Sequence, residues 1–278
     1  MTTISGRYQI GMFALIISSG LHLACSEAPQ VPTAIYQVQR LSPGHIINVN
    51  DHSLTEWGDS LVVMRITPQD AKNLQWKNIR GRTPKTLSPA DVGITVYMAL
   101  DTEYWYVALE AHDDKVLPAP PAYPYSGDCL EIFFAGKELD SPRDFHDHLD
   151  DQAEAAFFQF ELPVGITGSG YYFSEWRTGS TFRTNVIGSG FMASAWTTAS
   201  GWSGEARIPI AAFEPEVRSR IELGETLKMN IDYLDYDIRT ARQDEDDDWG
   251  FLPDNVLCLD AAEENANTPK YMRSVIFK

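Results

Sequence analysis

The sequence has few cysteines and few basic residues, and both shortages exclude classes of protein. Only three of its 278 residues are cysteine, and none lies in a C-x-x-C pair or in a Cys/His spacing typical of zinc sites. Lysine and arginine total 22 against 39 aspartates and glutamates, which gives a formal net charge of −17 at pH 7. Such a surface repels nucleic acid and anionic lipid headgroups. We therefore expect neutral or cationic partners and bound cations, and no nucleic acid.

Hydrolase motifs are missing as well. The chain contains no G-x-S-x-G, no H-E-x-x-H and no EF-hand loop. Paired carboxylates are the minimum for glycoside hydrolysis, but with 39 acidic residues such pairs arise by number alone. His146 and His148 are the one local cluster with metal-ligand chemistry, and their acidic surroundings favour a polar loop. We therefore predict that the chain is not an enzyme, with weak glycoside hydrolase activity as the alternative.

Long apolar helical stripes are also absent, and short alternating runs dominate instead. Strands are predicted at Leu61–Ile66, Ile94–Leu100, Trp105–Ala111, Leu130–Ala135, Ala155–Leu162, Tyr171–Arg177, Phe182–Ile187, Phe191–Thr197, Trp202–Ile208, Leu227–Tyr236, Val256–Leu259 and Ser274–Phe277. Short helical turns are predicted at Pro68–Asn73, Pro209–Phe213 and Pro215–Arg220. Regularly spaced short strands separated by turn residues predict an all-β sandwich or barrel.

The alternation within these strands separates an apolar face from a polar one. Three apolar sets are expected to be core: Leu130, Ile132 and Phe134; Trp202, Ala206 and Ile208; and Leu227, Met229, Ile231 and Tyr233. The polar residues between them point to the other side of a sheet: Glu131, Glu205, Arg207, Asn230 and Asp232. This polar side is either a solvated face or a shallow ligand-binding face, and the sequence leaves both open.

The order of motifs resembles the family 9 carbohydrate-binding modules and the wider DOMON-like group. An opening Leu-Thr-Glu-Trp element at 54–57 is followed by a hairpin strand at 103–108 and by Asp-Cys-Leu-Glu-Ile-Phe at 128–133. Gly-Trp-Ser-Gly-Glu-Ala-Arg-Ile-Pro at 201–209 comes later. The resemblance covers about residues 45–278 and implies a jelly-roll-like antiparallel β-sandwich with short helical turns. It also implies binding of sugar ends or short oligosaccharides, in support of polysaccharide degradation or uptake, and calcium ions that support the fold.

A sugar site needs a flat aromatic surface and planar polar side chains that bond hydroxyl groups. Three tryptophans lie inside motif strands and are interpreted as core: Trp57, Trp105 and Trp202. The candidate platforms lie near strand ends or polar loops, with Trp76 as a weaker one: Trp176, Trp196 and Trp249. The candidate polar partners are Arg177, Arg207, Asn230 and Asp232.

Calcium needs several oxygen ligands, mostly carboxylates and carbonyls. The candidate ligands occupy the acidic positions of the family: Asp113, Asp114, Asp128 and Glu131. The acidic run Asp244–Asp248 is either a second site or, as such runs usually are, a solvated loop. Relatives in the wider group bind haem, so a haem-binding electron-transfer protein is the alternative function. It would need two axial ligands that face one pocket, such as a methionine with a lysine or a histidine, and the available methionines include Met64, Met98, Met192 and Met229.

The first 24 residues resemble an export signal, with Arg7 in a thin basic region before a short apolar core. The segment Gly20–Cys25 resembles a bacterial lipoprotein cleavage box, in which Cys25 is lipidated and becomes the new N-terminus. Membrane contact would then be through the lipid anchor only. Ordinary secretion is the alternative, while Ser18, Ser19 and His22 in a short apolar run argue against a transmembrane anchor.

Residues 25–35 are interpreted as a Pro-containing linker. Residues 36–278 then form one domain, a size that a single β domain commonly reaches. We expect this domain in the cell envelope as a lipoprotein, or secreted. Its two cysteines, Cys129 and Cys258, either form one disulfide in an oxidising compartment or stay buried free thiols.

Overall fold

The computed structural model describes most of the predicted domain. The described residues are 35–66, 93–118, 127–136, 157–165, 167–168, 190–213, 215–236, 240–241, 251–252, 255–258 and 273–278. At residues 157–159, 167–168, 240–241, 251–252 and 255–258 only the backbone is described. The strands predicted at 171–177 and 182–187 and the turn predicted at 68–73 lie outside the described residues.

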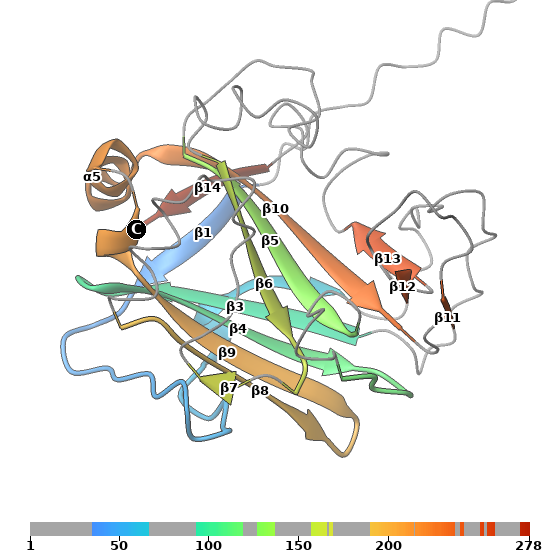
Figure 1. Ribbon diagram of the computed structural model, residues 1–278. Coiled ribbons are helices and arrows are strands. Elements are labelled where there is room, and N and C mark those ends of the chain that lie inside the picture. The colour runs from blue at the N-terminus through green and yellow to red at the C-terminus, as the bar shows by residue number, and fades with distance from the viewer. Residues whose placement is uncertain are drawn as a thin grey trace, which may run out of the picture.

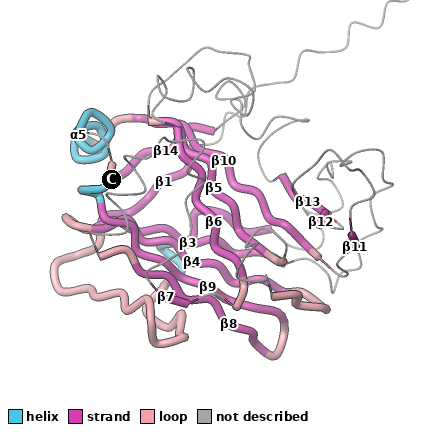
Figure 2. The backbone as a smooth tube through the Cα atoms, viewed as in Figure 1, coloured by secondary structure: helices cyan, strands magenta, loops and turns pink. Residues whose placement is uncertain are grey.

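Two layers of strands pack face to face (Figure 1). The first layer contains β5 (Cys129–Ala135), β6 (Phe157–Pro163), β10 (Thr226–Asp235), β13 (Asn255–Cys258) and β14 (Arg273–Phe277). The second layer contains β2 (Val62–Ile66), β3 (Gly93–Leu100), β4 (Tyr104–His112), β7 (Thr167–Gly168), β8 (Met192–Thr198) and β9 (Gly201–Pro209). Strands dominate the described chain (Figure 2), so the predicted all-β sandwich is confirmed.

Strand β1 (Ile35–Arg40) belongs to both layers. Its residues 35–38 pair with β14, and its residues Gln39 and Arg40 pair with Ala99 and Leu100 of β3. Both pairings are parallel, whereas the other pairings between described strands are antiparallel, as predicted. The sheet therefore folds over at β1, with the order β6-β5-β10-β14-β1-β3-β4-β9-β8-β7.

Most predicted strands lie within two residues of the observed ones. Strand β1 was not predicted, although Tyr36 and Val38 alternate with exposed neighbours and point into the core. The predicted turn at Pro209–Phe213 is the short helix η3 (Ile210–Ala212). The turn predicted at Pro215–Arg220 is a helix, α5 (Pro215–Leu223). The remaining described elements are η1 (Asp59–Leu61), β11 (Thr240–Ala241) and β12 (Phe251–Leu252).

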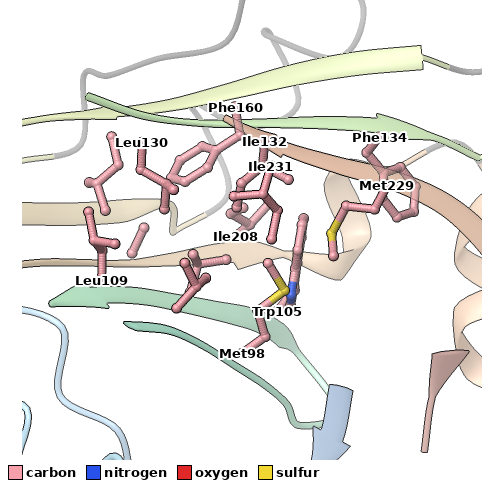
Figure 3. Packing of buried hydrophobic residues seen from close by; sticks show 14 of the residues in the cluster. Met98, Trp105, Leu109, Leu130, Ile132, Phe134, Phe160, Ile208, Met229 and Ile231 are labelled. Atoms are coloured by element: carbon pink, nitrogen blue, oxygen red, sulfur yellow. The ribbon is translucent and has the colours of Figure 1, made fainter. Parts of the chain in front are cut away.

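The main core fills the space between the two layers. Figure 3 shows Leu130, Ile132 and Ile231 of the first layer facing Leu109 and Trp105 of the second. The Trp105 ring lies 5.9 Å from the Phe134 ring and 6.0 Å from the Phe277 ring, measured between centroids. Each such fully buried side chain contributes about 1.5–3 kcal/mol by leaving water. All three apolar sets predicted from alternation belong to this core.

A second apolar cluster covers the outer face of the second layer. Ile47, Val49 and Trp57, from the chain between β1 and β2, pack on Tyr97 and Tyr106 of β3 and β4. Strands β3 and β4 are consequently buried on both faces over most of their length. Trp57 joins Trp105 and Trp202 as a buried tryptophan, which confirms the interpretation of all three as core.

The polar face of the first layer is buried too. Every residue of β5 is buried, including Glu131, and Asn230 and Asp232 on β10 are 0% and 3% exposed. Glu205 on β9, in the second layer, is 0% exposed. A solvated face is therefore excluded for these four residues.

The structure decides against a disulfide between Cys129 and Cys258. Cys129 is a buried free thiol, and burial raises its pKa well above the ordinary value. Strand β10 runs between β5 and β13, so Cys129 lies opposite Leu234 while Cys258 lies opposite Asp232. Two strand spacings place β5 and β13 about 10 Å apart, beyond the Cα separation of a disulfide.

None of the helices in the described part of the chain has the length and apolar character needed to cross a membrane.

Candidate functional site

Three carboxylates meet on the outer face of the second layer. Glu205 comes from β9, while Asp51 and Glu56 come from the chain between β1 and β2. One oxygen of each residue lies within 4.8 Å of an oxygen on both others. We call Asp51, Glu56 and Glu205 the carboxylate cluster. The indole Nε1 of Trp57 donates a hydrogen bond of 3.2 Å to Glu205 Oε2 and so fixes the chain over β9.

Local hydrogen bonds shape the loop that supplies Asp51 and Glu56. The backbone N–H of Ser53 donates to Asp51 Oδ1 at 3.0 Å, an Asx-type turn favoured by the Asn, Asp and Ser residues of this stretch. The backbone N–H of Asn48 donates to Glu56 Oε1 at 3.0 Å. Both carboxylates are thus held in position by their own loop before any ligand is considered.

The surroundings of Glu205 disfavour its charged form. Burial raises its pKa from 4.5 to about 8, and the negative charges of Glu56 and Asp51 add to this effect. The hydrogen bond from Trp57 acts in the opposite direction. The cluster therefore favours a proton or a cation at Glu205 near neutral pH.

Trp196 lies beside this cluster. It is half-buried on β8, and its ring stacks on His52 with centroids 5.1 Å apart and planes inclined by 15°. Ser194 is the direct cross-strand neighbour of Glu205, so Trp196, two residues further along β8, is its diagonal neighbour on the same face. His52 has a φ of 57°, a left-handed conformation that is unusual for a residue with a side chain.

Arg207 forms a second aromatic pair on this face. Its guanidinium carbon lies 4.9 Å from the centroid of the Tyr104 ring, and its Nε donates to the carbonyl of Gly190 at 3.1 Å. Gly190 has a φ of 94°, and a Cβ there would lie 2.9 Å from the Tyr104 hydroxyl. Arg207 follows Glu205 by two residues of β9, so the two side chains point to the same side about 7 Å apart along the strand.

Asn230 and Asp232 lie on the other layer. Asn230 Nδ2 donates to Asp232 Oδ1 at 3.1 Å, and both side chains are buried on the outer face of the first layer. Asp232 is opposite Glu131, which is opposite Glu161 on β6. The five polar residues predicted on one side of a sheet are thus divided between two sheets, because β9 and β10 belong to different layers.

A second group of acids lies where the two layers meet at one end. Asp113 follows β4, Asp128 precedes β5 and Asp235 ends β10, and their oxygens lie within 4.8 Å of one another. We call these three residues the aspartate trio. The prediction paired Asp113 with Asp128, and the structure brings them together. Asp114 is exposed and Glu131 lies further along β5, and neither is in the trio, whereas Asp235 was not predicted.

Asp128 is the centre of the trio. Its Oδ2 accepts the backbone N–H of Leu117 at 2.6 Å, and its Oδ1 accepts that of Tyr236 at 2.8 Å. Burial, assisted by the charge of Asp113, raises the pKa of Asp128 from 3.8 to about 8. The two backbone donors oppose this shift without cancelling it.

The remaining predicted residues fall outside the part of the chain that the structure describes. They are Cys25, Trp76, His146, His148, Trp176, Arg177, Trp249 and the run Asp244–Asp248. The methionines named for the haem alternative are described: Met64, Met98 and Met229 lie in the main core, and Met192 packs against the second apolar cluster.

Comparisons with known proteins complete these observations. Neither a family model nor a curated protein matches the sequence. Among solved structures, a family 9 carbohydrate-binding module from Caldicellulosiruptor kristjanssonii in complex with glucose is similar at 15% identity and a TM-score of 0.47, covering 88% of this chain and 96% of that chain. The same module in complex with cellotriose gives the same identity and TM-score, with 88% and 94% covered. These similarities are low, so the function is inferred from the residues of this chain.

Proposed function

We propose that the chain is a non-catalytic carbohydrate-binding protein whose sugar site lies at Trp196 on the outer face of the second layer. The observation that carries this proposal is the half-buried Trp196 ring, which is stacked on His52 and diagonal to Glu205. An aromatic face packs against the C–H groups of a sugar ring. Carboxylate oxygens beside it accept hydrogen bonds from sugar hydroxyl groups. A neutral oligosaccharide also suits a strongly acidic surface.

The Tyr104–Arg207 pair extends the proposed site along β9. Only Nε of the Arg207 guanidinium is bonded, to Gly190, among the hydrogen bonds of the described residues. Its other nitrogens can donate to a neighbouring hydroxyl pair in the plane of the group. Trp176, Arg177 and Trp249 stay proposed contributors on their sequence positions. Asn230 and Asp232 lie on the other layer and are not part of the Trp196 site.

We also propose a calcium ion at the aspartate trio. Three buried carboxylates at one end of the sandwich repel one another, and a hard cation offsets that repulsion. The proposed ligands are Asp113, Asp128 and Asp235, in place of the predicted Asp114 and Glu131. An ion there would join the ends of β4, β5 and β10 and so stabilise the fold.

The proposed setting is the cell envelope, with export and lipidation at Cys25. An anchored binder would raise the concentration of a glycan near partner hydrolases or transporters. Labelling of cells with radioactive palmitate tests the anchor, and a Cys25→Ala variant should lose both the label and partition into detergent.

A glycan array with the purified protein tests the sugar site. Trp196→Ala should lose the binding that the wild type shows, because the platform is removed. Leu223→Ala, which removes an exposed apolar side chain from α5, is the matched control and should bind normally. Glycan binding that survives Trp196→Ala but is lost in Trp176→Ala or Trp249→Ala would place the sugar site at Trp176 or Trp249 instead. A folded wild type that binds no glycan would overturn the function.

A further inference from the structure

The aromatic face that we propose as the sugar platform is occupied by a side chain of the protein itself. The His52 ring stacks on the Trp196 ring, with centroids 5.1 Å apart and planes inclined by 15°. Two rings at this spacing are in direct contact, so no sugar ring fits between them. A sugar that packs on this face of Trp196 must therefore take the place of His52.

Polar groups indicate that a sugar approaches Trp196 from the side that His52 covers. Asp51 directly precedes His52, is exposed, and meets Glu205 in the carboxylate cluster. Ser194 Oγ and Glu205 Oε1, on cross-strand neighbours, are buried and have no hydrogen-bond partner among the described residues. Buried polar atoms without partners are unfavourable, so the loop as it stands leaves polar groups beside the platform unsatisfied. The hydroxyl groups of a sugar at the place of His52 would lie next to these groups.

His52 is held on the platform only weakly. Its side chain is exposed, and within the described chain it forms no hydrogen bond or ion pair besides its stack on Trp196. Its φ of 57° is left-handed, and no other described residue except glycine has a positive φ. This conformation is unfavourable for a residue with a Cβ, so the backbone strain opposes the stack. The free energy that keeps His52 against Trp196 is therefore small.

The segment that carries His52 can move without unfolding the layer beneath it. Residues 50–52 are exposed, whereas Val49 before them and Trp57 after them are 1% and 5% exposed and belong to the second apolar cluster. The hydrogen bond from Trp57 to Glu205 attaches the far end of the segment to β9. A rotation between these two anchors disturbs few buried contacts, so His52 can leave its stack while the loop stays attached.

We propose that His52 is a cover of the Trp196 platform and that a bound sugar displaces it. In the free protein the imidazole lies on the indole, and in the complex the C–H face of the sugar takes its place. The indole N–H of Trp196 forms no hydrogen bond among the described residues, so it can donate to a sugar hydroxyl. A site that is open only part of the time has its apparent affinity reduced by the open fraction. This inference rests on the proposed function, because it concerns the same platform.

Replacement of His52 tests the cover. A glycan array that includes cellotriose is probed with a concentration series of the full chain and of each variant. His52→Asn removes the ring and introduces a side chain that tolerates the left-handed conformation. We expect it to lower the apparent Kd by about two- to tenfold, the factor that corresponds to one aromatic stack. Ile46→Ala, which removes a side chain that is 79% exposed in the same loop, is the control and should bind as the wild type does.

The direction of the change in Kd separates two roles of His52. An unchanged or higher Kd in His52→Asn, in a protein that loses binding on Trp196→Ala, would overturn the cover and leave the proposed function standing. His52 would then support the platform while the sugar binds the other face of the ring. If neither the wild type nor His52→Asn binds any glycan, the proposed function is rejected and the cover with it. Binding that survives Trp196→Ala would also overturn the cover, because the sugar would then lie elsewhere.

Proton NMR follows the displacement of the imidazole directly. The ring current of Trp196 shifts the His52 ring protons in the free protein, and Trp196→Ala gives their positions without the stack. His52→Asn identifies these signals by their loss. At saturation with the glycan that binds most tightly on the array, the His52 signals should move to the unstacked positions. Signals that keep their free-protein positions in the saturated complex would overturn the proposal, because the imidazole would still lie on Trp196.

Discussion

Trp202 and Tyr233 join the two layers of the sandwich through a hydrogen bond inside the core. The indole Nε1 of Trp202, on β9, donates to the hydroxyl of Tyr233, on β10, at 2.9 Å, and the two rings are stacked with planes inclined by 21°. The Tyr233 hydroxyl in turn donates to Asp113 Oδ2 at 3.1 Å. A polar chain thus runs from the apolar core to the aspartate trio, and both of its inner members are fully buried.

Removal of the Tyr233 hydroxyl should destabilise the protein. Tyr233→Phe leaves the Trp202 N–H without its acceptor and removes the donor to Asp113 Oδ2, while Asp113 Oδ1 still accepts the Lys115 backbone N–H. We therefore expect a loss of about 1–3 kcal/mol in the free energy of unfolding. Urea denaturation of Tyr233→Phe, Trp202→Phe and the double variant gives the coupling between the two residues. A Tyr233→Phe variant as stable as the wild type would show that the hydrogen bonds of Tyr233 do not contribute to stability.

The aspartate trio should make stability depend on pH in the absence of calcium. The folded-state pKa of Asp128 is raised to about 8, so the folded protein holds a proton that the unfolded chain releases near pH 4. Stability from this group is therefore present at low pH and lost as the pH rises toward 8. We expect this loss in urea unfolding with chelator between pH 5 and pH 8, and its reduction by calcium, which replaces the proton.

Single-residue variants isolate the contribution of each acid to the pH dependence of stability. Asp128→Asn cannot titrate and should remove part of the slope of stability against pH, even though it also loses one backbone hydrogen bond. Glu205, facing Asp51 and Glu56, has a raised pKa as well and contributes a slope of the same sign. Asp59→Asn, at the surface, should leave the slope unchanged. A slope that is identical in Asp128→Asn and the wild type would contradict the assignment.

The backbone of His52 stores strain that substitution can expose. His52→Ala loses the stack on Trp196 and keeps the φ of 57°, whereas His52→Gly loses the stack and relieves the strain. We expect the glycine variant to be more stable than the alanine variant by about 1 kcal/mol. Thermal and urea unfolding of the pair measure this difference, and equal stabilities would mean that the loop relaxes around residue 52.

Gly201 should be among the least replaceable glycines. A Cβ at this position would lie 2.2 Å from the carbonyl oxygen of Ala111 on β4, and the φ is 149°. We expect Gly201→Ala to cost roughly 3 kcal/mol or more, because neither backbone can give way without breaking the β4–β9 pairing. Gly44→Ala is the control: its φ is 87° and nothing lies within 4 Å, so it should cost about 1 kcal/mol from strain alone. Similar losses in both variants would indicate that the β4–β9 contact can adjust.

The alternation of residues along single strands was predictable because it is a local property. The inward positions of β5, β9 and β10 were identified correctly, as was the burial of Trp57, Trp105 and Trp202. What covers the outer faces was not predictable, because Ile47 and Trp57 reach β3 and β4 from far away in the sequence. The same limit explains Asp235, which joins Asp113 and Asp128 only through the register between β5 and β10.

The candidate site shows most clearly what could not be predicted from the sequence. Glu205 and Asp232 both occupy polar positions of an alternating strand, yet they point outward from different layers. Ser194 and His52 carried no signal of their own, since a serine in a strand and a histidine in a loop are ordinary. Their importance comes from the pairing of β8 with β9 and from the loop conformation around residue 52.

Strand β1 has a mechanical consequence. Its residues 35–38 run parallel to residues 274–277 of β14, so a force pulling Ile35 and Lys278 apart acts along the strands in shear. The slanted, evenly spaced bonds of a parallel pair then share the load together instead of opening one after another. Pulled by these two ends, the sandwich resists at its first and last described strands, before any load reaches the loop that carries Asp51 and His52.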